Sequence, residues 1–146
     1  MKIVLDTNVL VSGLLTPFGP SGETVRMVFS GELVLQIDAR ILSEYKDVLN
    51  RRKFKFNKDH IGILIDFIKQ YGQFISSSPL KSRLPDTDDE PFLEVAIAGK
   101  VSALVTGNIA HYPALLREGI DIYSPSEFIE FYRKQNKGTE SINKSL

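Results

Sequence analysis

The chain contains no cysteine and only two histidines, His60 and His111. Without cysteine there can be no disulfide, thiolate-bound zinc, iron–sulfur cluster or cysteine nucleophile. The two histidines lie far apart in the sequence and lack the four-residue spacing that places two imidazoles on one helix face. A zinc site built on histidines is therefore not expected.

The chain also lacks an excess of charge and any long apolar run. It has 18 basic and 18 acidic residues, a formal net charge of zero, whereas proteins that grip long nucleic acids by charge carry a basic excess. A local basic patch remains compatible with this balance. No apolar stretch approaches the length of a membrane span, and the N-terminus shows no secretory signal pattern. We therefore expect a cytoplasmic protein with no membrane partner.

The length of 146 residues and the apolar pattern predict one α/β domain. Short β-branched runs alternate with segments of helical spacing, which predicts a three-layer α/β/α fold with a mainly parallel, twisted sheet. We expect the domain to cover residues 1–135 and the polar tail 136–146 to be disordered. The predicted strands are 2–5, 33–37, 74–75, 101–105 and 120–123. The predicted helices are 8–15, 21–30, 40–51, 58–71 and 91–99, and a final helix that follows 124–126 and ends near 135.

Polar residues follow two of the predicted strands, at the point where each strand ends. They are residues 6–8 (Asp-Thr-Asn) and 106–108 (Thr-Gly-Asn), and an acidic cluster at 86–90 opens the helix before the second of these strands. The carboxyl ends of parallel strands lie at one edge of a sheet. The start of a helix that precedes a strand lies at the same edge, so the cluster should approach Asp6. Clustered carboxylates repel one another unless a cation lies between them, and oxygen ligands without thiols favour Mg²⁺ or Mn²⁺.

Each of these polar residues also has an ordinary structural interpretation. Asp6 could be the N-cap of the following helix, a position that Thr7 or Asn8 could also occupy. The acids at 86–90 could be caps that complement the helix dipole. Glu44 could be an exposed surface residue of a helix, and Asn108 could be a turn residue.

Three segments together resemble the PIN domain family. Residues 3–10 (Ile-Val-Leu-Asp-Thr-Asn-Val-Leu) resemble its opening strand motif, and residues 42–45 (Leu-Ser-Glu-Tyr) resemble the helix with its second acid. Residues 86–96 and 103–108 resemble the helix with the third acid and the strand after it. In detail the chain is similar to the branch of toxins from prokaryotic toxin–antitoxin pairs, over about residues 1–135.

The resemblance implies a nuclease that uses Mg²⁺ or Mn²⁺ to hydrolyse phosphodiester bonds of single-stranded RNA. It assigns catalysis to Asp6, Glu44 and a third acid, which falls on Asp89 or Glu90; the pattern of the branch favours Asp89. Many members carry Asp where this chain has Asn108, which could still bind a metal through its carbonyl but brings no charge. The implied metal ligands are Asp6, Glu44, Asp89 and Asn108, and the implied supporting residues are Thr7, Asn8, Asp86, Glu90 and Thr106.

The run at 51–56 combines basic and aromatic residues and follows the helix that carries Glu44, so it could contact single-stranded RNA. Its basic members are Arg51, Arg52, Lys53 and Lys55. The alternative is a solvated helix end whose two phenylalanines point into the core. Lys81 and Arg83 are other candidates for phosphate contacts.

The resemblance also implies an antitoxin that covers the site and inserts a basic side chain among the acids, and it is compatible with a homodimer. A second hypothesis is a catalytically weak or inactive PIN-fold module that binds RNA or a protein partner. A phosphatase or phosphotransferase is less consistent with the sequence, because Asn8 stands where such enzymes carry a second Asp. A dinucleotide-binding fold is not expected, since no Gly-x-Gly-x-x-Gly follows the first strand.

Overall fold

The computed structural model describes residues 1–145, and the side chains of residues 1–137. Its elements are β1 (Lys2–Leu5), α1 (Thr7–Leu15), α2 (Pro20–Phe29), β2 (Val34–Ile37), α3 (Ala39–Leu49), η1 (Arg52–Phe54), α4 (Lys58–Tyr71), β3 (Gln73–Phe74), η2 (Thr87–Asp89), α5 (Glu90–Gly99), β4 (Ala103–Val105), η3 (Ile109–His111), η4 (Ala114–Leu116), β5 (Ile122–Tyr123) and α6 (Pro125–Ser145). The predicted alternation of strands and helices is confirmed.

The five strands form one sheet in the order β3-β2-β1-β4-β5, and every pairing is parallel. The chain therefore first adds β2 and β3 on one side of β1, and later adds β4 and β5 on the other side. Such a reversal opens a crevice beyond the carboxyl ends of the two strands where the order switches. Here these strands are β1 and β4.

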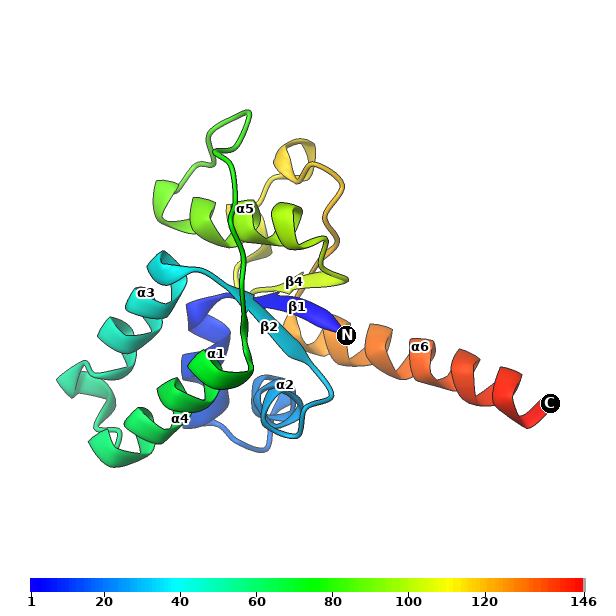
Figure 1. Ribbon diagram of the computed structural model, residues 1–146, viewed down its shortest axis with the longest axis horizontal. Helices are drawn as coiled ribbons and strands as arrows, with labels where there is room; N and C mark the ends of the chain where they lie inside the picture. The colour runs from blue at the N-terminus through cyan, green and yellow to red at the C-terminus, as the bar shows by residue number, and fades with distance from the viewer. Residues whose placement is uncertain (146) are drawn as a thin grey trace.

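Helices cover both faces of the sheet, which confirms the three-layer α/β/α architecture (Figure 1). Helix α5 packs on β1, β2 and β4 on one face, and α6 packs on β4 and β5 beside α2 on the other. The central strands have no exposed apolar surface: Ile3, Val4, Leu5, Leu104 and Val105 are fully buried. Parallel strands buried on both faces read as continuous apolar runs, and this explains the pattern in the sequence. None of the helices described over residues 1–145 is long and apolar enough to cross a lipid bilayer.

Two details of the prediction are wrong. Neither Thr7 nor Asn8 is the N-cap of α1, because the helix begins at Thr7 itself and the hydroxyl of Thr7 is donated to Glu44. Helix α6 does not end near Gln135 but continues to Ser145, so residues 136–145 are helical and only residue 146 lies outside the described residues. The segment has no proline that would end the helix, and just before it Glu130 and Lys134 form an i,i+4 pair at 3.1 Å, of the type that supports an exposed polar helix.

Candidate metal centre

Asp6 lies in the crevice between β1 and β4. Leu5 pairs in register with Val105, so Asp6 and Thr106 leave the sheet at the same level. The Thr106 hydroxyl donates to Asp6 Oδ2 at 2.9 Å, and the Tyr112 hydroxyl donates to the same oxygen at 3.2 Å. Asp6 occupies the N-cap position of α1, but its side chain makes no capping hydrogen bond. Its carboxylate is therefore held by β4 and the segment after it, and the capping interpretation does not account for it.

Glu44 reaches the same crevice from α3. The Thr7 hydroxyl donates a hydrogen bond to Glu44 Oε2, which ties α3 to the first residue of α1. The next residue, Tyr45, is fully buried and donates from its hydroxyl to the carbonyl oxygen of Leu5. Two adjacent residues of α3 thus bind the end of β1 and the start of α1. Glu44 is half-buried rather than the exposed surface residue that its position in the helix suggested.

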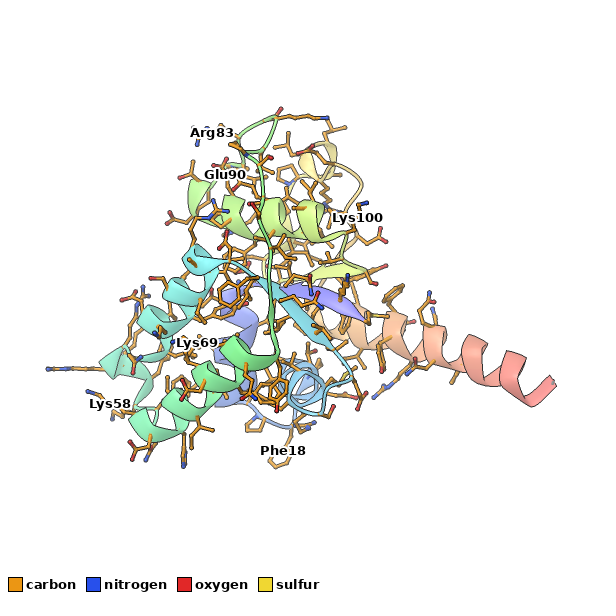
Figure 2. The ribbon with its side chains drawn as sticks, viewed as in Figure 1. Phe18, Lys58, Lys69, Arg83, Glu90 and Lys100 are labelled. Carbon is orange, nitrogen blue, oxygen red and sulfur yellow. The ribbon has the colours of Figure 1, made fainter. Side chains whose placement is uncertain are left out.

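Asp89 is the acid of the 86–90 cluster that turns toward Asp6, because it ends the 3-10 turn η2 at the start of α5. Its neighbour Glu90 turns away: it pairs with Arg83 at 3.1 Å and accepts a hydrogen bond from the Leu84 backbone N–H at 3.0 Å. Figure 2 shows Arg83 and Glu90 together at the outer end of α5. Asp86 caps η2 by accepting from the Asp88 backbone N–H at 2.9 Å. Asp89 therefore lines the pocket and Glu90 does not, while the role of Asp89 as the third acid stays a prediction.

A single pocket of about 450 Å³ collects these carboxylates. Helix α1, helix α3 and the turn η2 provide its walls, and its acidic lining residues are Asp6, Glu44, Asp86, Asp88 and Asp89. Arg51 and Phe54, from the segment after α3, complete one side. Residues about eighty positions apart in the sequence thus share one anionic cavity.

Burial raises the pKa of three of these acids, and the charge of Asp6 adds to the rise in two of them. The pKa of Asp6 is raised by burial, although the Thr106 and Tyr112 hydroxyls oppose the rise. Burial also raises the pKa of Glu44, and the nearby charge of Asp6 adds to it. The pKa of Asp89 is raised to about 6, by burial first and by the charge of Asp6 second. A bound cation would relieve this unfavourable ionisation.

The raised pKa of Asp89 predicts how stability depends on pH without divalent ions. The folded protein holds this proton up to about pH 6, while the unfolded chain releases it near the ordinary aspartate pKa of 3.8. Stability from this group is therefore present at low pH and is lost as the pH rises from about 4 to about 6. Melting temperatures measured across that range in EDTA should fall less steeply for Asp89→Asn than for the unmodified chain. Melting temperatures that fall in parallel for the two proteins would contradict a raised pKa of Asp89.

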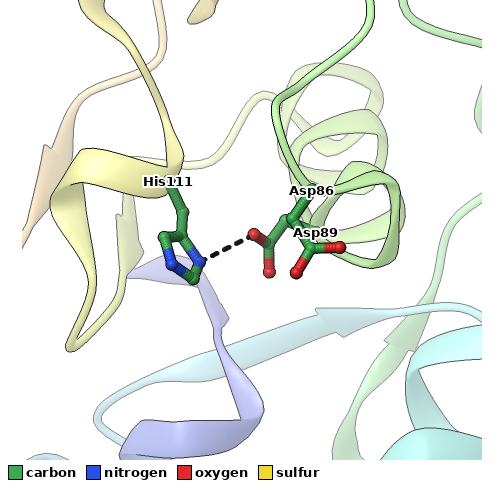
Figure 3. A group of neighbouring side chains, drawn as sticks. All are labelled: Asp86, Asp89 and His111. Carbon is green, nitrogen blue, oxygen red and sulfur yellow. Dashed lines mark hydrogen bonds and ion pairs between the residues drawn. The ribbon is translucent and has the colours of Figure 1, made fainter.

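His111 stands beside the acids and was not predicted (Figure 3). Its Nδ1 lies 3.0 Å from Asp89 Oδ2, and with one oxygen each of Asp86 and Asp89 it forms a trio of potential ligand atoms within 4.8 Å of one another. The spacing of the two histidines argues against a zinc site but says nothing about a single imidazole beside the acids. The available signal was the position of His111 a few residues beyond the end of β4, at the edge where the acids gather.

Of the two asparagines expected at the site, Asn8 lines the pocket and Asn108 does not. Asn108 is exposed and does not line the pocket; its backbone N–H donates to Thr106 Oγ1 at 3.0 Å. Its role as a metal ligand stays a prediction. Asn8 lines the pocket and accepts a hydrogen bond from the Gly107 backbone N–H at 3.1 Å, which joins the two polar strand ends.

The basic segment at 51–56 has features of both interpretations of the sequence: exposed basic groups beside the pocket, and two phenylalanines packed against the core. Its four basic residues are all exposed: Arg51, Arg52, Lys53 and Lys55. Phe54 and Phe56 are half-buried against the core and stack on each other, with ring centroids 5.6 Å apart. Arg51 lines the pocket and pairs with Asp47 at 3.2 Å, while the Lys53 ammonium lies 5.0 Å from the centre of the Phe54 ring.

The donor set fits a hard divalent cation. Carboxylate oxygens predominate, one imidazole nitrogen accompanies them, and the chain has no thiol. Such a set suits Mg²⁺ or Mn²⁺ rather than a structural zinc. Thr106, Tyr112 and Thr7 hold two of the carboxylates in place by hydrogen bonds, as the partners of metal ligands commonly do.

Known proteins resemble this chain in sequence and in fold. The sequence matches the PIN domain family over residues 2–110. It is 26% identical to the uncharacterized protein MJ1680 of Methanocaldococcus jannaschii, over 92% of this chain and 93% of that protein. The crystal structure of FitAcB from Neisseria gonorrhoeae has a similar fold, with a TM-score of 0.54 and 13% identity, over 86% of this chain and 98% of that one. The chain belongs to the PIN domain family.

Proposed function

We propose that the protein is a metal-dependent endoribonuclease that hydrolyses single-stranded RNA. The observation that carries the proposal is the convergence of Asp6, Glu44 and Asp89 on one pocket, with Arg51 and Phe54 on its wall. A guanidinium suits a phosphate, and a phenyl ring suits the face of an unpaired base. The pocket thus offers groups for the cleaved bond and for the nucleotide beside it.

A Mg²⁺ or Mn²⁺ ion in this pocket would activate a water molecule and neutralise charge on the phosphodiester. Asp6 and Asp89 would hold that ion, since burial raises the pKa of both and a cation restores their charged form. Glu44 is positioned by the Thr7 hydroxyl and has a raised pKa, so its carboxylate can accept the proton that leaves the attacking water. Arg51 would orient the phosphate.

The activity is tested with end-labelled RNA of one sequence in single-stranded and in fully paired form. We expect cleavage of the single strand in Mn²⁺ or Mg²⁺ and none in EDTA, with internal products that identify an endonuclease. Cleavage that persists in EDTA, or that requires a free end, would contradict the proposal. Metal binding without any cleavage would favour the second hypothesis, a PIN-fold module that binds RNA or protein.

Arg51→Ala should weaken RNA binding more than catalysis. The side chain lines the pocket, and its ion pair with Asp47 is exposed, so the expected effect is a rise in KM of about tenfold with little change in kcat. A plot of the logarithm of the RNA-binding constant against the logarithm of salt concentration should become less steep by about one unit. Lys69→Ala is the matched control, because Lys69 is exposed in the last turn of α4, at the edge of the sheet where β3 begins. Equal effects of the two substitutions would contradict an RNA contact by Arg51.

We further propose that the protein is the toxin of a toxin–antitoxin pair. The proposal rests on the motifs at residues 3–10, 42–45 and 86–96, which resemble that branch of the family. An antitoxin that places a basic side chain among the buried acids would relieve the same repulsion that a cation relieves. Induced expression should then arrest growth of the host. The arrest should be absent for the Asp6→Asn variant and relieved by co-expression of a small neighbouring reading frame. Normal growth during expression of active nuclease would contradict the toxin role.

A further inference from the structure

The element η3 brings an imidazole to the acids, close to the strand-end motif, which has Asn108 where many family members have an acid. Asn108 brings no charge and is exposed. One 3-10 turn further along, His111 ends η3 and turns back toward the start of α5. Figure 3 shows its ring projecting from that segment toward Asp86 and Asp89, on the opposite side of the gap.

The spacing of the ligand atoms matches one coordination shell. Adjacent ligands of an octahedral ion, each at about 2.1 Å, lie about 3.0 Å apart. His111 Nδ1 and Asp89 Oδ2 lie 3.0 Å apart. The oxygen of Asp86 completes a trio within 4.8 Å, and a small shift of the exposed Asp86 side chain would bring it into the same shell. The ion would replace a proton between Nδ1 and Oδ2.

We infer that His111 is a ligand of the divalent ion through Nδ1 and that this nitrogen makes the site bind Mn²⁺ in preference to Mg²⁺. The inference rests on the proposed metal-dependent nuclease. Magnesium in proteins is bound by oxygen ligands, whereas imidazole is a ligand of first-row transition ions. Manganese belongs to that series and also accepts carboxylate-rich sites, so of the two ions Mn²⁺ is better suited than Mg²⁺ to a combination of acids with one imidazole.

The competing role for His111 is to hold Asp89 by a hydrogen bond without touching the ion. In that case the imidazole would help every metal equally, because it would act only on the orientation of the carboxylate. A direct ligand instead changes the preference between metals. The ratio of the two affinities therefore distinguishes a ligand from a positioning residue.

The chain offers a matched control, since its other histidine, His60, is exposed in the first turn of α4. Calorimetric titration of Mn²⁺ and Mg²⁺ is carried out on the full chain and on His111→Ala and His60→Ala. For His111→Ala we expect Mn²⁺ affinity to fall at least about tenfold while Mg²⁺ affinity changes little. His60→Ala should match the full chain for both ions. A fall of equal size for both ions in His111→Ala would overturn the inference.

Pulsed electron paramagnetic resonance supplies a readout that needs no folded His111 variant. The Mn²⁺-loaded chain should show hyperfine coupling to an imidazole ¹⁴N, and the coupling should persist in His60→Ala. Its absence from both proteins would overturn the inference. If these proteins bind Mn²⁺ and cleave RNA without the coupling, only the role of His111 fails. If they bind no Mn²⁺ and cleave no RNA, the proposed function fails as well.

Discussion

Asp6→Asn is expected to abolish RNA cleavage while leaving the fold intact. The substitution removes the charge that would bind the cation but keeps an oxygen that can accept hydrogen bonds from the Thr106 and Tyr112 hydroxyls. Even the partners that orient metal ligands typically contribute about 10- to 100-fold, so loss of the ligand charge itself should lower kcat at least about 100-fold. Single-turnover cleavage of labelled single-stranded RNA in saturating Mn²⁺ measures this.

Asp66→Asn is the matched control for this prediction, because Asp66 is exposed on α4. It should cleave RNA at the normal rate. Without metal, Asp6→Asn should melt no lower than the unmodified chain, because burial raises the pKa of Asp6 and so makes its charged form costly. A variant that keeps its cleavage rate would exclude Asp6 as a metal ligand. A variant that unfolds would show that the carboxylate is structural.

The second large effect is a contrast between two neighbouring acids. Asp89→Asn should lower cleavage at least about 100-fold, because Asp89 faces the pocket and Asp6. Glu90→Gln should keep most of its activity, because Glu90 points to Arg83 and the Leu84 backbone N–H. The two variants thus distinguish an acid that takes part in cleavage from an acid that holds the loop before α5.

The same two variants should rank in the opposite order in stability, with Glu90→Gln the less stable of the two. Glu90 is buried, so removing its charge weakens a hydrogen bond to backbone and should lower stability by about 1 kcal/mol. Asp89→Asn removes a carboxylate whose ionisation is unfavourable and should not destabilise the metal-free protein above pH 6. Denaturant unfolding in EDTA measures both. Loss of activity in Glu90→Gln with normal activity in Asp89→Asn would reverse the assignment.

The fold could be predicted because its signals are local. A buried parallel strand reads as an apolar run, as in Ile3, Val4 and Leu5, and an amphipathic helix shows its period over a few turns. The ends of elements were less predictable. Whether Thr7 caps α1 or donates to Glu44 depends on a helix that lies 37 residues away, and propensity alone carries no such information.

The site could be predicted in part. The position of Asp6 followed from the rule that sites gather at the carboxyl ends of parallel strands. Glu44 was found only through family resemblance, because a glutamate within an amphipathic helix has no local signal of its partner. Asp89 and Glu90 are adjacent, so only the three-dimensional turn of η2 separates them. His111 was missed because its contact with Asp89 spans 22 residues and matches no spacing rule.

The metal centre is tested most directly by a crystal structure of the chain grown with Mn²⁺, with anomalous scattering collected to locate the ion. We expect an anomalous peak in the pocket lined by α1, α3 and η2, within coordination distance of the carboxylates of Asp6 and Asp89, with Glu44 lining the same cavity. A peak elsewhere on the protein, or an empty pocket at saturating Mn²⁺, would contradict it.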